Sequence, residues 1–190
     1  MKKIYAILVI ALLATNLSFG QTILKADPMH SKLTFTVEHF GISDVFGLFQ
    51  KFDVTVTSSK PDFSDAVFEL STDLASINTE VKMRDDDLRS PHFFDVEKYP
   101  LMTFKSTSIK KDGKDRYKLT GNLTMHGVTK PVTMDLWYRG TMLDQMSKKQ
   151  RYGFQLAGTL NRYDFNIGPS YPEIAISNLV RIKADGEFIK

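Results

Sequence analysis

Apolar and polar residues alternate along most of this chain, and this pattern limits the fold more than any other feature of the sequence. Residues 32–39, KLTFTVEH, place an apolar side chain at every second position from Leu33 to Val37. Successive side chains of a strand point to opposite faces, so such a segment forms a strand with one apolar face. Seven further segments alternate in the same way: 52–57, 66–73, 102–105, 117–125, 132–138, 152–160 and 180–188. The sequence therefore predicts about eight strands.

Turn-forming residues separate these segments and indicate how the strands connect. The stretches SSKPDFSD at 58–65, KKDGKD at 110–115 and HGVTKP at 126–131 are rich in the residues that turns favour. Strands that each have a single apolar face must pack as a sandwich or close into a barrel. Closure removes both sheet edges and suits antiparallel strands that follow one another along the chain. We therefore predict an all-β fold, an eight-stranded antiparallel barrel.

The segment 76–98 departs from the alternation, because it is rich in charged residues and helix formers. It predicts one or two short helices, capped at Asn78 or Thr79 and interrupted at Pro91. Such helices would cover one end of the barrel as a lid or serve as a long connection, and the pattern leaves both open.

The first twenty residues have the order of a secretory signal peptide. Lys2 and Lys3 precede an apolar stretch at 4–17, and the small residues Ser18 and Gly20 suit cleavage near Gly20. We therefore expect a periplasmic or secreted protein whose barrel domain spans 21–190, with no transmembrane segment in that part. Without Lys2 and Lys3 the formal net charge falls from +3 to about +1. This balance argues against nucleic acid as a partner.

Motifs for catalysis or metal binding are lacking, and the chain has no cysteine. The four histidines have no metal-binding spacing, so neither a metal site nor a cofactor is predicted. His39 lies on the apolar side of its strand, as a cavity-facing group or as a structural histidine. His30 beside Asp27, and His126 near Thr124, are typical of residues that lock turns. The consecutive acids at 85–87 favour a solvated helix face, because neighbouring helical residues point about 100° apart.

The barrel interior is the remaining candidate for function. An eight-stranded barrel either fills its interior with side chains or encloses one small ligand, and 14 Phe and 8 Met against one Trp fit both cases. By parity, the residues expected to face inward and to contact any ligand are Phe35, Val37, Phe52, Val54, Phe68, Leu70, Phe104, Leu119, Leu123, Leu136, Phe154 and Leu156. Candidates for binding a polar head group are Arg84 and Arg89, with His39. The alternative for the two arginines is surface pairing with Asp85, Asp87 or Asp95.

Four blocks of the sequence resemble the YceI-like family of periplasmic, polyisoprenoid-binding, lipocalin-like proteins. They are DPMHSKLTFTVEHFGISDVFGLF at 27–49, ASINTEVKMRDDDLRSPHFFDVEKYPLMTFKS at 75–106, LTGNLTMHGVTKPVTM at 119–134 and LNRYDFNIG at 160–168. The resemblance implies an eight-stranded lipocalin-like barrel, export to the periplasm, and a long apolar pocket for an isoprenoid chain or similar amphiphile. Two positions depart from the family pattern. Asp87 replaces a frequent His and changes the charge at the mouth, and Asn166 replaces a frequent Gly in a loop.

Together, the pattern and the resemblance favour non-catalytic binding or transport of an isoprenoid-like lipid, such as a polyisoprenoid or an isoprenoid quinone. Two alternatives remain. One is a ligand-free envelope stress or interaction protein with a filled barrel, and the other is a lipid-modifying enzyme that uses Arg84, His39 or a neighbouring acid. Barrels of this kind often self-associate through surface strands, so a homodimer is an assembly to test. The sequence alone reveals no exposed apolar patch.

Overall fold

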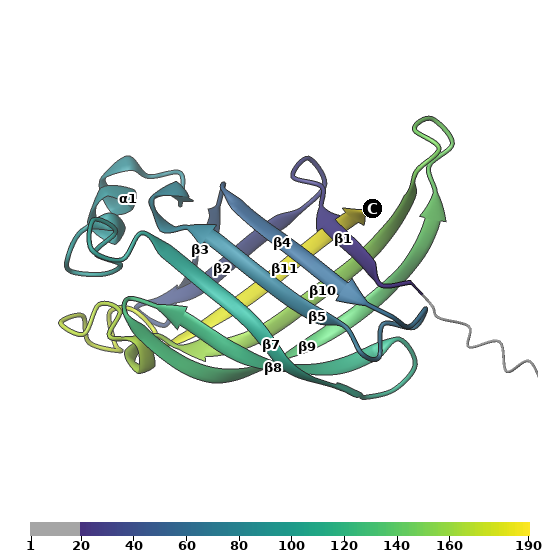
Figure 1. The fold of residues 1–190 in the computed structure, drawn as a ribbon. Helices are drawn as coiled ribbons and strands as arrows, with labels where there is room; N and C mark the ends of the chain where they lie inside the picture. The colour runs from purple at the N-terminus through teal and green to yellow at the C-terminus, as the bar shows by residue number, and fades with distance from the viewer. Residues whose placement is uncertain (1–19) are drawn as a thin grey trace, which may run out of the picture.

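Eleven antiparallel strands form one closed sheet in the computed structural model, which describes residues 20–190 (Figure 1). The strands are β1 (Thr22–Ala26), β2 (Lys32–His39), β3 (Ser43–Phe49), β4 (Phe52–Ser58), β5 (Val67–Asp73), β6 (Ile77–Asn78), β7 (Leu101–Lys111), β8 (Arg116–Met125), β9 (Val128–Leu143), β10 (Gln150–Asn161) and β11 (Leu179–Ile189). One helix, α1 (Lys82–Arg89), and two 3-10 turns, η1 (Leu74–Ser76) and η2 (Arg162–Phe165), complete the fold. The predicted signal peptide lies outside the described residues, apart from Gly20.

The ring closes through eight strand positions, which confirms the predicted barrel. The order is β1, β4, β5, β7, β8, β9, β10 and β11, and β11 pairs with β1 to close the sheet. Strand β11 pairs first with β1 and then with β2. On the other side, β4 pairs with β1 and β3 pairs with β2. Strands β1 and β2 are thus one long strand interrupted at 27–31, and β3 and β4 are one strand interrupted at 50–51. Strand β6 likewise continues β5, because β5 pairs with β4 and β6 pairs with β3. Eleven segments therefore fill eight positions.

The sequence pattern missed β1, β3 and β6, for local reasons. In β3 the exposed Phe46 points outward, while the inward position of Gly47 has no side chain, so polar and apolar residues do not alternate. Gly47 is required at this point because a Cβ atom would overlap the ring of Phe35 on the paired strand. The other two strands have only five and two residues, too few to show a period.

Helix α1 lies where a short helix was predicted, but its capping differs. It begins after Val81, whose side chain makes no cap, so the predicted caps at Asn78 and Thr79 are wrong. The side-chain oxygen of Asn78 accepts from the backbone N–H of Glu80, and Thr79 donates to Asp85 instead. Across residues 20–190, no helix has the length and apolar character needed to cross a membrane.

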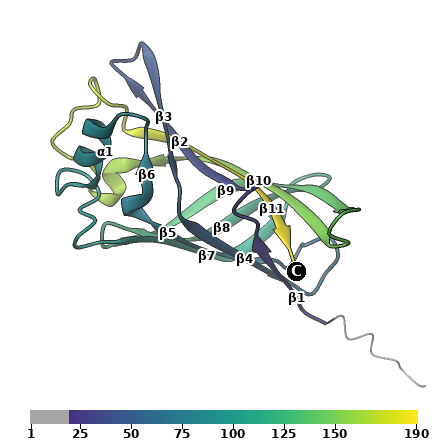
Figure 2. The ribbon, with the colours of Figure 1, turned by 90° about the horizontal axis from the view of Figure 1, so that it is seen from above.

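The two ends of the barrel differ. At one end, the ring of Phe63 packs against Tyr138, Tyr152 and Phe154, with ring centroids 5.0 to 5.7 Å apart. This aromatic cluster closes that end. At the other end lie α1, η2 and the segment 166–178 that leads into β11 (Figures 1 and 2).

Candidate functional site: a cavity inside the barrel

A cavity of about 840 Å³ occupies the barrel between the aromatic cluster and the end that carries α1. All twelve residues expected from parity to face inward lie in its wall: Phe35, Val37, Phe52, Val54, Phe68, Leu70, Phe104, Leu119, Leu123, Leu136, Phe154 and Leu156. They come from β2, β4, β5, β7, β8, β9 and β10, and Ile182 and Ala184 of β11 complete the wall around the ring. Parity therefore predicts where these side chains lie, while their contact with a ligand remains a prediction.

Other wall residues were not among the candidates. Met102, Met125, Met134 and Ile182 have inward parity and could have been found by extending the same rule. In contrast, Phe93, Phe94 and Tyr171 lie in irregular segments, where no period shows which way a side chain points.

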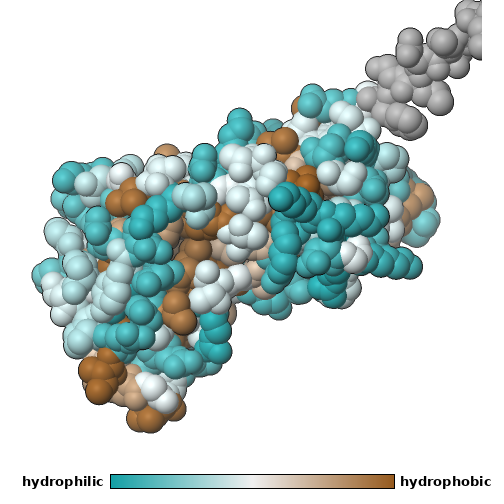
Figure 3. Space-filling model, turned by 90° about the horizontal axis from the view of Figure 1, so that it is seen from below, coloured by the Kyte–Doolittle hydropathy of each residue, from teal (hydrophilic) through white to brown (hydrophobic). Residues whose placement is uncertain are grey.

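The sheet is not fully paired around this cavity. Strands β9 and β10 are paired only as far as Asp135 and Ala157, and their remaining residues diverge toward the end that carries α1. Met134, in the cavity wall, occupies the space that Gly158 leaves on the facing strand. Figure 3, seen from below, shows a furrow with hydrophobic residues at its bottom between two hydrophilic regions.

Helix α1 forms part of the cavity wall and thereby covers this end of the barrel. Val81, Met83, Arg84, Asp87 and Leu88 belong to the wall, and His39 and Val45 of the β2–β3 hairpin belong to it as well. Because Met83 and His39 are also exposed, the cavity reaches the surface here. We call this opening the mouth.

Arg84 brings a positive charge to the mouth. Its Nε donates to the hydroxyl of Thr79 at 2.8 Å, and one terminal nitrogen donates to the Thr79 carbonyl at 2.9 Å. No carboxylate within residues 20–190 forms an ion pair with it, so the alternative of surface pairing is wrong for this residue. Asp85 instead accepts from the backbone N–H and the hydroxyl of Thr79, at 2.8 and 2.6 Å.

Arg89 lies away from the cavity, which argues against its predicted role as a head-group ligand. Its guanidinium donates to the carbonyls of Ala75 and Ile77, both at 2.8 Å, and pairs with Asp86 at 3.2 Å. These bonds fix α1 to η1 and β6. Arg89 is therefore a structural residue of the mouth. It does form an ion pair, as the alternative expected, but with Asp86 and not with Asp85, Asp87 or Asp95.

Asp87 and Tyr171 meet at the mouth. The hydroxyl of Tyr171 donates to Asp87 at 3.0 Å, and His92 Nδ1 lies 3.1 Å from the same carboxylate. The hydrogen bond to Asp87 is the main reason that the pKa of Tyr171 is raised. The three acids of α1 thus point in different directions, as expected from their helical spacing. The predicted solvated face is wrong for two of them, since Asp85 is buried and Asp87 lies in the cavity wall.

Arg162, which the sequence analysis did not single out, is the most buried cation of the site at 4% exposure. Its guanidinium donates to the hydroxyl of Tyr163 and to five backbone carbonyls, those of Ile167, Gly168, Tyr171, Ile176 and Ser177. One side chain thereby holds the whole segment 166–178 against the barrel. Asn166 has φ of 56°, the left-handed conformation that favours Gly and tolerates Asn, which explains how it replaces a glycine here.

His39 lies in the cavity wall at the mouth, with its ring 4.2 Å from the ring of Phe40. Its position is that of a cavity-facing group, one of the two roles expected for it. Whether it contacts a ligand remains a prediction.

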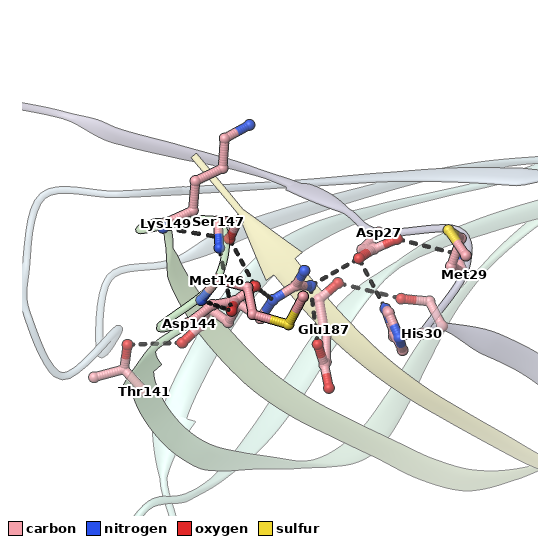
Figure 4. A network of polar contacts seen from close by, with 11 residues as sticks. Asp27, Met29, His30, Thr141, Asp144, Met146, Ser147, Lys149 and Glu187 are labelled. Atoms are coloured by element: carbon pink, nitrogen blue, oxygen red, sulfur yellow. Dashed lines mark hydrogen bonds and ion pairs between the residues drawn. The ribbon is translucent and has the colours of Figure 1, made fainter.

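A second polar cluster lies near the closed end of the barrel (Figure 4). Asp27, His30 and Glu187 place ligand-type atoms within 4.8 Å of one another, a grouping that their sequence spacing did not reveal. However, an Arg151 nitrogen lies 2.8 Å from Asp27 and 3.1 Å from Glu187, so a cation of the chain already pairs with both carboxylates. Hydrogen bonds from His30 and then Arg151 lower the pKa of Asp27 to about 2. The cluster is an ion-pair network that locks the 27–31 interruption, as predicted for His30 beside Asp27.

An antiparallel barrel that encloses an apolar cavity, with a few polar groups at one mouth, defines a class of barrels built to hold hydrophobic molecules. Within that class, the chain belongs to the YceI-like family, because the model of the YceI-like domain matches residues 24–188.

Known relatives agree with this assignment. The UPF0312 protein PC1_2518 of Pectobacterium carotovorum is 39% identical over 151 residues, which cover 77% of this chain and 78% of that protein. The crystal structure of the YCEI protein of Campylobacter jejuni is 30% identical, with a TM-score of 0.73 over 80% of this chain and 89% of that chain. A polyisoprenoid binding domain from Saccharophagus degradans shares the fold, with a TM-score of 0.66 at 18% identity over 87% of this chain and 97% of that chain.

Proposed function

We propose that this protein binds or carries, without catalysis, one long-chain amphiphilic lipid of the isoprenoid type in the barrel cavity, with a polyisoprenoid or an isoprenoid quinone as the preferred class. The observation that carries this proposal is the apolar cavity itself, which reaches the surface beside a small set of polar groups. The name of the Saccharophagus degradans domain, which has the same fold, supports the ligand class.

Energetics favour an apolar occupant. The cavity opens at the mouth, so water can enter it, but its wall offers few polar groups with which water could form hydrogen bonds. Water gains little from an apolar wall, whereas each methylene-sized group of a lipid gains about 0.8 kcal/mol when it leaves water. A chain-like lipid is therefore the occupant that this wall stabilises best.

The polar groups at the mouth suit a head group. Arg84 has no carboxylate partner among the described residues, and its guanidinium matches phosphate or quinone oxygen atoms. The Tyr171 hydroxyl and His39 lie in the same wall. We propose that Arg84 contacts the head group while the tail extends toward Phe154.

The order of residues 1–20 supports the further proposal that the protein is exported and works in the periplasm or outside the cell. Mass determination of the N-terminus in fractionated cells tests this, and an uncleaved chain in the cytoplasm would refute it.

The direct test is mass spectrometry of the organic extract from exported protein purified without detergent. We expect about one isoprenoid-type lipid per chain. The matched variants are Ala184→Trp, whose side chain fills the cavity, and Ala157→Trp, which places the same indole on the exposed outer face of the neighbouring strand. Only the first should lose the lipid. A protein that carries no lipid and binds no added isoprenoid refutes the proposal.

The two alternatives make different demands. A ligand-free interaction protein needs a filled barrel, and the cavity argues against that. A lipid-modifying enzyme needs turnover of the lipid, so mass analysis of the lipid before and after incubation, with Arg84→Ala and His39→Ala in parallel, tests it.

A further inference from the structure

Five apolar side chains project into solvent around the mouth. They are Phe40 and Ile42 on the β2–β3 turn, Val81 and Met83 at the start of α1, and Ile174 before β11. Their exposed fractions run from 42% for Val81 to 87% for Ile42. We call this group the apolar rim. The β2–β3 hairpin projects from the barrel in Figure 2, and hydrophobic residues gather at the corresponding corner of the surface in Figure 3.

The rim is held together and is continuous with the cavity. The backbone N–H of Phe40 donates to the carbonyl of Ala175 at 3.1 Å, and His39 bridges to Ile176, so the hairpin and the loop that carries Ile174 are joined. Val81 and Met83 belong to the rim and to the cavity wall at once. These two side chains therefore carry apolar surface from solvent into the barrel, beside the polar groups of the mouth.

Several charges beside the rim are paired within the chain. Arg181 pairs with Asp44 at 2.5 Å, and Lys82 pairs with Asp86 at 2.5 Å. Glu80 and Arg84 add one charge of each sign at the start of α1, while the exposed Glu38 and Glu173 form no ion pair within residues 20–190. The rim thus has no cationic excess that would attract anionic lipids, so a bilayer would contact it through its apolar side chains.

We propose that the apolar rim inserts into the surface of a lipid bilayer and holds the mouth against it. This inference rests on the function proposed above. Docking would let an amphiphile move between the membrane and the cavity without crossing water. The five residues stand on three separate segments of the chain, the β2–β3 turn, the start of α1 and the loop before β11. Short projecting turns suit insertion among head groups, whereas a stable interface between two copies needs about 800 Å² of fitted surface on each.

The test is flotation of the exported protein with neutral phosphatidylcholine vesicles that contain no isoprenoid. The double variant Ile42→Ser/Ile174→Ser removes two rim side chains that are not part of the cavity wall. The matched control, Met142→Ser/Met146→Ser, makes the same kind of change at exposed residues of the β9–β10 hairpin, at the other end of the barrel. We expect the unchanged protein and the control to float, with little effect of salt, and the rim variant to bind at least ~10-fold more weakly.

A second measurement separates this inference from the proposed function. All three proteins should take up an isoprenoid delivered from ethanol equally well, but the rim variant should extract it from vesicles more slowly. If the unchanged protein does not float, or if the rim variant floats equally well, the docking proposal is overturned, even when the isoprenoid loads normally. Normal flotation without loading refutes the lipid-carrier function and leaves the docking in place. If native mass spectrometry shows a dimer that the rim substitutions dissociate, and no protein floats, the rim joins two copies and the proposal is wrong.

Discussion

Replacing Arg162 by Met tests whether one buried cation holds the segment that covers the mouth. Methionine keeps an unbranched, apolar side chain of similar length in the same space, so packing changes little. The hydrogen bonds to five backbone carbonyls are lost. Among the described side chains, only the hydroxyl of Tyr163, which donates to the carbonyl of Tyr171 at 2.7 Å, then still binds one of these five carbonyls.

The loss of stability depends on which of the five carbonyls can form a hydrogen bond with water after the substitution. Those of Tyr171, Ile176 and Ser177 belong to half-buried residues and can hydrate after a small shift. Those of Ile167 and Gly168 belong to buried residues, but the Gly168 carbonyl still accepts from the backbone N–H of Tyr171 at 3.1 Å. Only the Ile167 carbonyl is left buried without a donor, which costs about 1–3 kcal/mol, so we expect the free energy of unfolding to fall by about 2 kcal/mol.

Urea denaturation at neutral pH measures this loss, and hydrogen exchange shows whether residues 166–178 open first. Arg181→Met is the matched control, because Arg181 is an exposed residue paired with Asp44 and should cost less than about 1 kcal/mol. Lipid retention should fall in Arg162→Met and not in the control, since Tyr171 and Ile176 line the cavity. A loss below about 1 kcal/mol for Arg162→Met, or unchanged exchange in 166–178, would refute the reasoning.

Three further predictions address other parts of the barrel. Phe63→Ala removes the centre of the aromatic cluster and should lower the free energy of unfolding by about 3–5 kcal/mol in urea denaturation, and a cost under about 1 kcal/mol would contradict its packing. Asn166→Val should destabilise by about 1–2 kcal/mol and Asn166→Gly should not, because φ is 56°; equal thermal midpoints would contradict the conformational argument. Because the pKa of Asp27 is lowered from 3.8 to about 2, its contribution to stability is complete above about pH 4 and is lost as the pH falls toward 2. Asp27→Asn should therefore flatten the loss of thermal stability between pH 4 and pH 2, and an unchanged pH profile would refute this coupling.

The barrel and the direction of its side chains could be predicted because they depend on a local property. In β8, for example, Leu119 and Leu123 are four positions apart and therefore point to the same face of the strand. Both are buried in the structure. Strand β3 escaped prediction because its inward Gly47 makes room for Phe35, a residue of another strand. When a neighbouring strand requires a glycine at an inward position, the apolar and polar residues of the strand that holds the glycine no longer alternate.

The two arginines of α1 show the same limit for the site. Arg84 and Arg89 look equivalent in sequence, but five positions on a helix turn the side chain by about 500°, so they point about 140° apart. One guanidinium reaches the cavity wall, and the other turns toward η1 and β6. Only the way in which the helix packs on the barrel decides which arginine reaches the cavity. Arg162 is harder still, because its acceptors lie up to 15 residues away in a segment without regular structure.

The difference between the two ends of the barrel gives the proposed ligand an orientation. The aromatic cluster around Phe63 closes one end, so a chain that enters at the mouth must stop against Phe154 and its neighbours. Its polar end then remains near Arg84, beside the apolar rim that would face the bilayer. A lipid whose tail fills the cavity places its head group at Arg84, whereas a longer tail pushes the head group out past the rim. The depth of the cavity and the position of Arg84 would thus jointly favour one tail length. In this way a wall without specific polar contacts could still discriminate among lipids.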